Sequence, residues 1–199
     1  MATIGVSKPH VAKYVNADGT VSYTDVTRLA KAVQFSAEIS SGDGSNNLYA
    51  DNGVAESDKS FEGGTMTITT DDLDQAGSAL LLGITPKSVT IGGKEIEELV
   101  FDDDAIAPYL GFGCVIKKKR NNAIKWRAVV FTKVMFAIPS DAATTQGETI
   151  EWQTAELEAT IMRDDSAKHV WKREATFDTE SDAEAYIKSV LADTSAPGA

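Results

Sequence analysis

The sequence has 199 residues, 42% of them hydrophobic, and a formal net charge of -11 at pH 7. This length and apolar content suit one domain with a sizeable core, whereas the negative charge disfavours sequence-independent binding to nucleic acid or anionic lipid, which both require a basic surface. The single cysteine, Cys114, excludes an internal disulfide and is expected to pack as a small hydrophobic residue.

The N-terminal part of the chain follows the two-residue period of β-strands. Residues 11–16 and 20–25 alternate apolar and polar side chains on either side of residues 17–19, Ala-Asp-Gly, which is a hairpin signal. Residues 32–39 and 64–70 alternate in the same way, so we expect them to pair as antiparallel strands. The apolar face of the third strand holds Val33, Phe35, Ala37 and Ile39.

A long polar stretch, residues 40–62, separates these two strands. It is too long for a hairpin turn, and its glycine, asparagine and aspartate content is expected to keep it out of regular structure. Leu48, Tyr49 and Val54 are apolar residues within it. The stretch is therefore expected to pack either on its own domain or on a neighbouring molecule.

One internal helix follows. We expect it to be capped by Asp71 or Asp72 and to end near Gly83. The face expected to lie against a sheet holds Leu73, Ala76, Leu80 and Leu81. Residues 88–91 and Ile96 flank a Gly-Gly pair and predict another hairpin.

The strongest strand patterns come next, in residues 112–118 and 124–137, around the turn Asn121-Asn122. A run of four basic residues lies at the tip of this hairpin. It is interpreted as a solvated tip or as protection of a strand edge, or alternatively as a contact with an acidic neighbour. A nucleic-acid patch is disfavoured because the run is short and has no interleaved aromatic residues.

The C-terminal part predicts further strands and a closing helix. Residues 149–163 alternate with an interruption at 153–155 that indicates a bulge or bend, and residues 168–177 form a further strand or connection. Ser181 is expected to cap a helix over residues 182–191. Its buried residues would be Ala185, Ile187 and Leu191. One domain over residues 1–192 and a flexible tail, residues 193–199, are expected.

No motif for catalysis is found. His10 and His169 are the only histidines and do not form a zinc motif, and the aspartate runs, such as residues 102–104, lack calcium-loop spacing. The glycine pairs match no nucleotide-binding pattern. No apolar run is long enough to cross a bilayer, and the first residues lack the features of a secretory signal. We therefore expect a structural or binding protein with no catalytic, cofactor or metal residues and no membrane segment.

Four segments together carry a family resemblance: residues 48–56 (LYADNGVAE), 65–73 (TMTITTDDL), 111–113 (GFG) and 154–161 (TAELEATI). In this order, and with the short leucine-rich helix and the basic hairpin between them, they resemble the major tail protein of bacteriophages with long, non-contractile tails. The likeness extends over nearly the whole chain.

The resemblance implies a fold of the α+β class that is mainly β: an antiparallel β-sandwich or barrel of the tail-tube type, with one internal flanking helix and a C-terminal helix. It also implies hexameric rings that stack around a tape-measure protein between tail-tip and terminator proteins. DNA would pass through the lumen without specific binding. The subunit would be found in the virion tail, and in the host cytoplasm during assembly.

The resemblance further implies that the long loop and the terminal segments make contacts between subunits or rings. Under this interpretation the basic hairpin is a candidate for contact with acidic residues of a neighbour. A tube subunit of a related bacterial injection or secretion device is an alternative with the same fold. A monomeric β-sandwich binding module is another, but it would need a face rich in exposed aromatics, and Trp126, Trp152 and Trp171 are scattered in sequence. The candidate contact residues are Leu48, Tyr49, Asp51 and Val54 in the loop and Lys117, Lys118, Lys119 and Arg120 at the hairpin tip.

Overall fold

The computed structural model describes residues 1–41, 47–50, 53–57, 60–103, 105–140, 145 and 153–192. This part of the chain is mainly β, as expected, with twelve strands and two helices. In chain order they are β1 (Ala2–Ala17), β2 (Thr20–Arg28), β3 (Ala32–Ser41), β4 (Asn47–Ala50), β5 (Gly53–Ser57), β6 (Phe61–Thr70), α1 (Gln75–Leu82), β7 (Lys87–Ile91), β8 (Lys94–Glu98), β9 (Leu110–Arg120), β10 (Ala123–Phe136), β11 (Ala155–Met162), β12 (Lys172–Phe177) and α2 (Glu180–Ala192).

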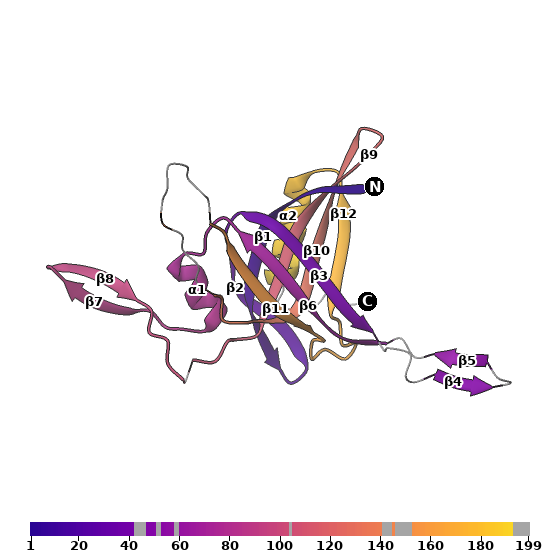
Figure 1. The fold of residues 1–199 in the computed structure, drawn as a ribbon, viewed down its shortest axis with the longest axis horizontal. Coiled ribbons are helices and arrows are strands. Elements are labelled where there is room, and N and C mark those ends of the chain that lie inside the picture. Colours follow the sequence, from indigo (N-terminus) through magenta and orange to yellow (C-terminus); the bar gives the residue numbers. More distant parts are fainter. Residues whose placement is uncertain are drawn as a thin grey trace.

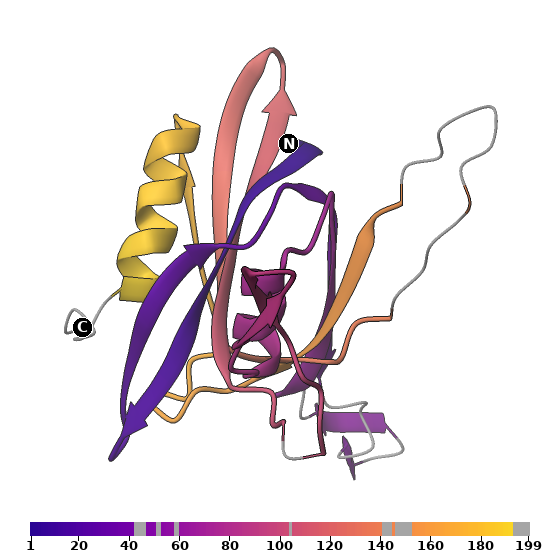
Figure 2. The ribbon, with the colours of Figure 1, turned by 90° about the vertical axis from the view of Figure 1, so that its left-hand side faces the viewer.

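Eight of the strands form one antiparallel sheet in the order β2-β1-β9-β10-β11-β6-β3, with β12 also paired to β10 (Figure 1). The long strand β10 divides this sheet, because residues 126–131 pair with β12 and residues 133–136 pair with β11. Strand β3, at one end of this strand order, also lies close to β1 near the other end, so the sheet curls round on itself. Figure 2 shows α2 on one side of β9 and β10, and β6 and β11 on the other.

The two faces of β9 and β10 are both buried, which explains their long apolar runs. Phe112 and Phe131 point into a core shared with β6, β11 and α1, whereas Val115 and Val130 lie under α2. The glycine of position 113 is required for this packing, because a Cβ there would lie 2.6 Å from Ile187 Cγ2 of α2. Cys114 is fully buried in the first core, as predicted, and burial raises the pKa of its thiol to about 12.

Three predicted hairpins are confirmed. The central turn residues Asp18 and Gly19, Gly92 and Gly93, and Asn121 and Asn122 all have positive φ, between 48° and 81°. Two such residues in a row make the turn whose twist matches that of the flanking strands. The predicted antiparallel pairing of residues 32–39 with 64–70 is also confirmed, as β3 with β6.

Two residues on the predicted buried face of β3 are exposed. Val33 is 55% and Ile39 is 40% exposed, whereas Phe35 and Ala37 pack against the core. Ile39 lies near the end of β3, beside a shift in register between Ser40 and Ser41. The register between β3 and β6 shifts between Ala32 and Gln34, and Val33 lies in this irregularity. A bulge adds one residue to a strand and turns its side chain away from the alternating pattern.

Both helices begin at a different residue from the one predicted. The cap of α1 is Asp74, whose Oδ1 accepts a hydrogen bond of 2.7 Å from the Gly77 amide, whereas Asp71 accepts one from the Lys31 amide. Three aspartates within four residues, at positions 71, 72 and 74, offer the same chemistry, and the position of the first turn selects among them. The predicted end at Gly83 is confirmed by its left-handed conformation. Ala76 was expected to be buried but is exposed.

In α2, the hydroxyl of Thr179 rather than that of Ser181 accepts the Asp182 amide hydrogen. The helix therefore begins earlier than predicted, at Glu180. Ile187 and Leu191 are buried as predicted, but Ala185 is exposed.

The expectation that residues 40–62 lack regular structure is wrong. Strands β4 and β5 form an antiparallel hairpin in which Tyr49 lies opposite Val54. The sequence between the paired residues Ala50 and Gly53 is Asp51-Asn52, and polar residues of this kind before glycine favour a tight turn. The stretch is therefore long because it contains a hairpin of its own.

The remaining predictions concern the C-terminal third. Strand β11 begins at Ala155, where an interruption was expected, and residues 149–152 and the tail 193–199 lie outside the described residues. The possible strand in residues 168–177 is β12. Neither described helix is long and apolar enough to cross a bilayer.

Candidate interaction surfaces

The first predicted contact region is the β4–β5 hairpin. It is a separate two-stranded sheet with no pairing to the main sheet, and it lies clear of the main sheet in Figure 1. Leu48 and Tyr49 are in β4 and Val54 is in β5. Their side chains, and all of Asp51, lie outside the described residues, so their predicted contacts stay predictions.

The second predicted region, which we call the basic tip, ends strand β9 and contains Lys117, Lys118, Lys119 and Arg120. Lys117 Nζ lies 4.9 Å from the centre of the Trp126 ring. Within the described residues, none of the four forms an ion pair. Lys118 also lies directly opposite Lys125 in β10, an arrangement of like charges that costs folding energy. The fold itself does not require this concentration of positive charge.

The N-terminus of β1 lies beside the basic tip. Ala2 pairs with Lys119 and Thr3 with Lys118, so two segments far apart in sequence form one surface. This surface also carries exposed apolar side chains, because Ile4 is 51% and Ile124 is 42% exposed. Sequence reasoning missed them, since nothing local indicates that β1 pairs with β9.

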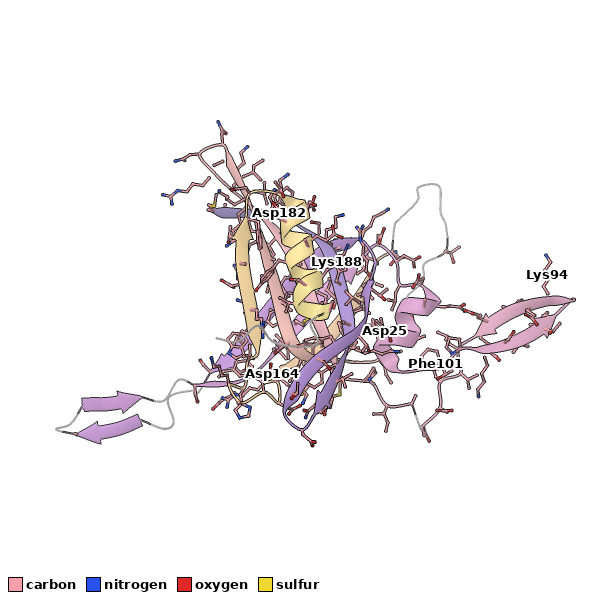
Figure 3. The ribbon with its side chains drawn as sticks, turned by 180° about the vertical axis from the view of Figure 1, so that it is seen from behind. Asp25, Lys94, Phe101, Asp164, Asp182 and Lys188 are labelled. Atoms are coloured by element: carbon pink, nitrogen blue, oxygen red, sulfur yellow. The ribbon has the colours of Figure 1, made fainter. Side chains whose placement is uncertain are left out.

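A third surface, the β7–β8 arm (residues 87–98), was predicted as a hairpin but not as a site. It pairs only with itself and extends from the body, with Lys94 at its end and Phe101 near its base (Figure 3). Val89 lies opposite Ile96, and Ile91 is 63% exposed. Alternating apolar residues such as Val89 and Ile91 normally indicate a buried face, so the sequence did not show that this face is exposed.

A polar cluster fixes the β1–β2 hairpin to the body. The Tyr14 hydroxyl donates to Asp165 Oδ2 (2.8 Å), which also accepts from Lys133 Nζ (2.8 Å). The Tyr23 hydroxyl donates to the Thr132 carbonyl (2.8 Å). Hydrogen bonds from Lys133 and Tyr14 lower the pKa of Asp165, and burial raises the pKa of both tyrosines. These groups act as structural anchors.

A second polar cluster attaches α2 to β1. Glu184 Oε2 lies 3.0 Å from Lys8 Nζ, while its Oε1 lies 2.8 Å from Lys188 Nζ and 3.5 Å from His10 Nε2. Hydrogen bonds from Lys188 and Lys8 lower the pKa of Glu184 to about 2. Burial lowers the pKa of His10, whose Nδ1 lies 3.0 Å from the Lys8 carbonyl oxygen. A histidine held in this way between a carbonyl and a carboxylate is a structural connection.

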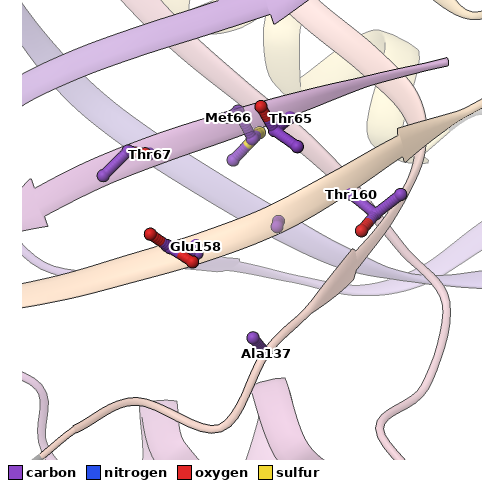
Figure 4. A pocket seen from close by; sticks show the side chains of 7 residues that line it. Thr65, Met66, Thr67, Ala137, Glu158 and Thr160 are labelled. Carbon is purple, nitrogen blue, oxygen red and sulfur yellow. The ribbon is translucent and has the colours of Figure 1, made fainter.

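A hollow of about 190 Å³ lies between β6, β11 and the end of β10 (Figure 4). Glu158 is its one titratable side chain, and threonine hydroxyls supply the other polar side-chain groups. Acid–base or nucleophilic chemistry needs at least two matched groups, so this hollow is a poor candidate for an active site. Elsewhere in the described residues, no group of three or more His, Cys, Asp or Glu side chains could hold a metal ion. The residues that line the hollow are Thr65, Met66, Thr67, Ala137, Glu158, Ala159 and Thr160.

Neither a scan against protein-family models nor a search of curated proteins finds a match for this chain. The resemblance to phage major tail proteins therefore stays a prediction, based on the residues quoted above. The surfaces described here have to be interpreted from their own chemistry.

Proposed function

We propose that this chain is a structural subunit of a bacteriophage tail tube. Hexameric rings of it would stack around a tape-measure protein, end at tip and terminator proteins, and form the conduit for DNA ejection. The observation that carries the proposal is the pair of hairpins, β4–β5 and β7–β8, which leave the body in different directions and pair only with themselves (Figure 1). The subunit would have no catalytic role and no cofactor.

Isolated two-stranded hairpins support this interpretation because they are marginally stable in water. The β7–β8 arm also exposes Ile91 and Ile96, side chains that a protein acting alone would bury. Neighbouring subunits would cover both hairpins. Because each hairpin would meet a different surface of the next copy, the contact is heterologous and produces a ring or a filament.

The net charge of -11 is consistent with a conduit for DNA. Acidic walls repel a passing polyanion and keep it from adhering, whereas a basic wall would hold it. In this proposal the subunit is found in the virion tail after assembly in the host cytoplasm. A charge map of the assembled ring with a neutral or basic bore would contradict this part of the proposal.

The alternatives differ in what can be measured. A subunit of a bacterial injection device would form the same rings, so the neighbouring genes have to distinguish it from a phage protein. Phage capsid and tape-measure genes beside it would indicate a phage tail, and their absence would favour the injection device. A monomeric binding module would remain a compact monomer.

The test is the mass of the purified chain by light scattering, followed by negative-stain electron microscopy, with the chain produced alone and together with its tape-measure protein. We expect hexameric rings or tubes in at least the second preparation. Compact monomers in both preparations would overturn the proposal. Tyr49→Ala should block tube formation and leave the subunit folded, because an aromatic contact at the loop would be lost; unaltered tubes would contradict a role for the loop.

A further inference from the structure

We propose that the β7–β8 arm of one copy binds the basic tip of a second copy. The inference rests on the proposed assembly of this chain into rings, and it identifies which two surfaces meet. It follows from the charge, exposure and position of the two surfaces.

One face of the arm carries two glutamates and no basic residue, and the other carries apolar side chains between charged ends. Strand pairing places Glu95 opposite Thr90 and Glu97 opposite Ser88, on one face. Val89, Ile91 and Ile96 lie on the other face, where Lys94 is opposite Ile91 and Lys87 is opposite Glu98. Further acidic residues, Glu98, Asp102 and Asp103, follow at the base of the arm, where Lys87 also lies. Lys87 and Lys94 are the two basic residues between positions 87 and 103.

The arm has no partner for these groups within the described part of the chain. None of its carboxylates forms an ion pair there. A Cβ added at Gly92 or Gly93 would meet no atom within 4 Å, so the end of the arm is in open space. The exposed isoleucines indicate that the arm is covered in the working protein, and its carboxylates indicate that the cover is basic.

The basic tip supplies such a cover. Lys119 lies opposite Ile124 in β10 and opposite Ala2 in β1, so lysines and exposed apolar side chains share this surface with Ile4 nearby. Apolar contact surrounded by opposite charges is the usual composition of a specific interface. A nucleic acid could also contact the lysines, but it would not cover the arm, whose carboxylates would repel it.

The two surfaces cannot meet within one chain. The arm and the basic tip extend from opposite sides of the body in Figures 1 and 3. In each copy, the arm is therefore free to bind the basic tip of one neighbour, and the basic tip is free to bind the arm of another. Such a contact repeats from copy to copy, which is the requirement for closing a ring.

The test reverses charge on each surface separately. The arm variant carries Glu95→Lys and Glu97→Lys, and the tip variant carries Lys118→Glu and Lys119→Glu. Alone, each variant should need about tenfold or more protein to associate than the unaltered chain in sedimentation velocity, because like charges then meet. Mixed in equal amounts they should associate again, since the reversed arm meets the reversed tip and the unaltered arm meets the unaltered tip.

Two controls accompany these variants. Glu156→Lys and Lys168→Glu reverse exposed charges outside both surfaces and should leave association unchanged. If a reversal variant does not fold, Glu95→Gln with Glu97→Gln removes the charge without adding any; weaker association of this variant supports the contact, and unchanged association contradicts it.

The outcomes separate the two proposals. Rings that form normally from either reversal variant would overturn this inference and leave the tail-tube proposal standing. Open chains or dimers that respond to the reversals as described, with no rings or tubes in any preparation, would support the contact and overturn the tail-tube proposal. An unaltered chain that stays monomeric in every preparation would overturn both.

Discussion

The hairpins β1–β2 and β7–β8 are built by the same local chemistry but have different surroundings. Both close on two turn residues with positive φ. The first is covered by α2, with Tyr23 7% exposed, whereas the second exposes Ile91 and Ile96. The comparison teaches that turn residues determine whether a hairpin forms, and that the surfaces around the hairpin determine whether its apolar side chains are buried or exposed.

The polar contacts of the two hairpins differ in the same way. Tyr14 and Tyr23 of the first are hydrogen-bonded to Asp165 and to the Thr132 carbonyl of the body. The charged groups of the second have no ion-pair partner among the described residues. Variants of α2, which covers the first hairpin, and of the exposed side chains of the second can therefore test whether the two hairpins contribute differently to stability.

The largest effect should come from weakening the cover of the first hairpin. Ile187 of α2 is fully buried against the sheet, and Ile187→Ala should lower the free energy of unfolding by roughly 2–5 kcal/mol, the cost of a cavity of this size. Urea unfolding followed by circular dichroism measures it. Ala185→Ser, at an exposed position of the same helix, is the control and should change stability by less than about 0.5 kcal/mol. A loss below about 1 kcal/mol for Ile187→Ala would mean that α2 is not an important cover.

An intermediate, pH-dependent effect is expected at Glu184. Its pKa in the folded protein is about 2, below the ordinary 4.5, so its carboxylate form stabilises the fold. This stabilisation is complete above about pH 4.5 and is lost as pH falls towards 2. The lowered pKa of His10 adds a separate loss of stability as pH falls below 6.5, because the unfolded chain then binds the proton more readily.

Glu184→Gln should therefore be less stable than the unaltered protein at pH 7 by on the order of 1 kcal/mol, a value reduced by solvent around the ion pairs. The difference should shrink as pH falls below 4.5. Unfolding curves from pH 7 to about 3 measure it. A difference that stays constant over this range would show that the carboxylate charge is not what attaches α2 to β1. Glu156→Gln is the matched control, and it should follow the unaltered protein.

The smallest effect on the subunit itself is expected at the arm. Ile91→Ser with Ile96→Ser should change the free energy of unfolding of the monomer by less than about 0.5 kcal/mol, because both side chains are already exposed. The same change should prevent assembly. Unfolding at a protein concentration too low for association, together with microscopy at a high one, measures both. A decrease of about 2 kcal/mol in the free energy of unfolding of the monomer would show that the arm packs on its own body. The two hairpins would then not differ in the way described.

The features predicted correctly from sequence are those determined by neighbouring residues. Asn121-Asn122 and Gly92-Gly93 specify turns by themselves, and Gly83 specifies the end of a helix. The hairpin in residues 40–62 was not predicted because the whole stretch is much longer than a hairpin turn, although Asn52-Gly53 within it is a strong turn signal.

The predictions that were wrong concern features that depend on distant parts of the chain. The exposure of Val33 follows from its register against β6, and the burial of Gly77 rather than Ala76 follows from where α1 meets the sheet. For the candidate surfaces, the basic run was visible in the sequence. Its apolar neighbour Ile4 and the exposure of the arm became visible only with the order of the strands.

The position of β1 between β2 and β9 has a consequence for how the chain folds during synthesis. Val11 pairs with Phe112. One edge of β1, the first strand to be synthesised, therefore lacks its backbone hydrogen bonds until β9 has been synthesised. Pairings so distant in sequence slow folding, and an unpaired edge is open to other chains in the meantime. The yield of soluble subunits in a cell should accordingly depend on how fast translation reaches β9, and less on the stability of the finished domain.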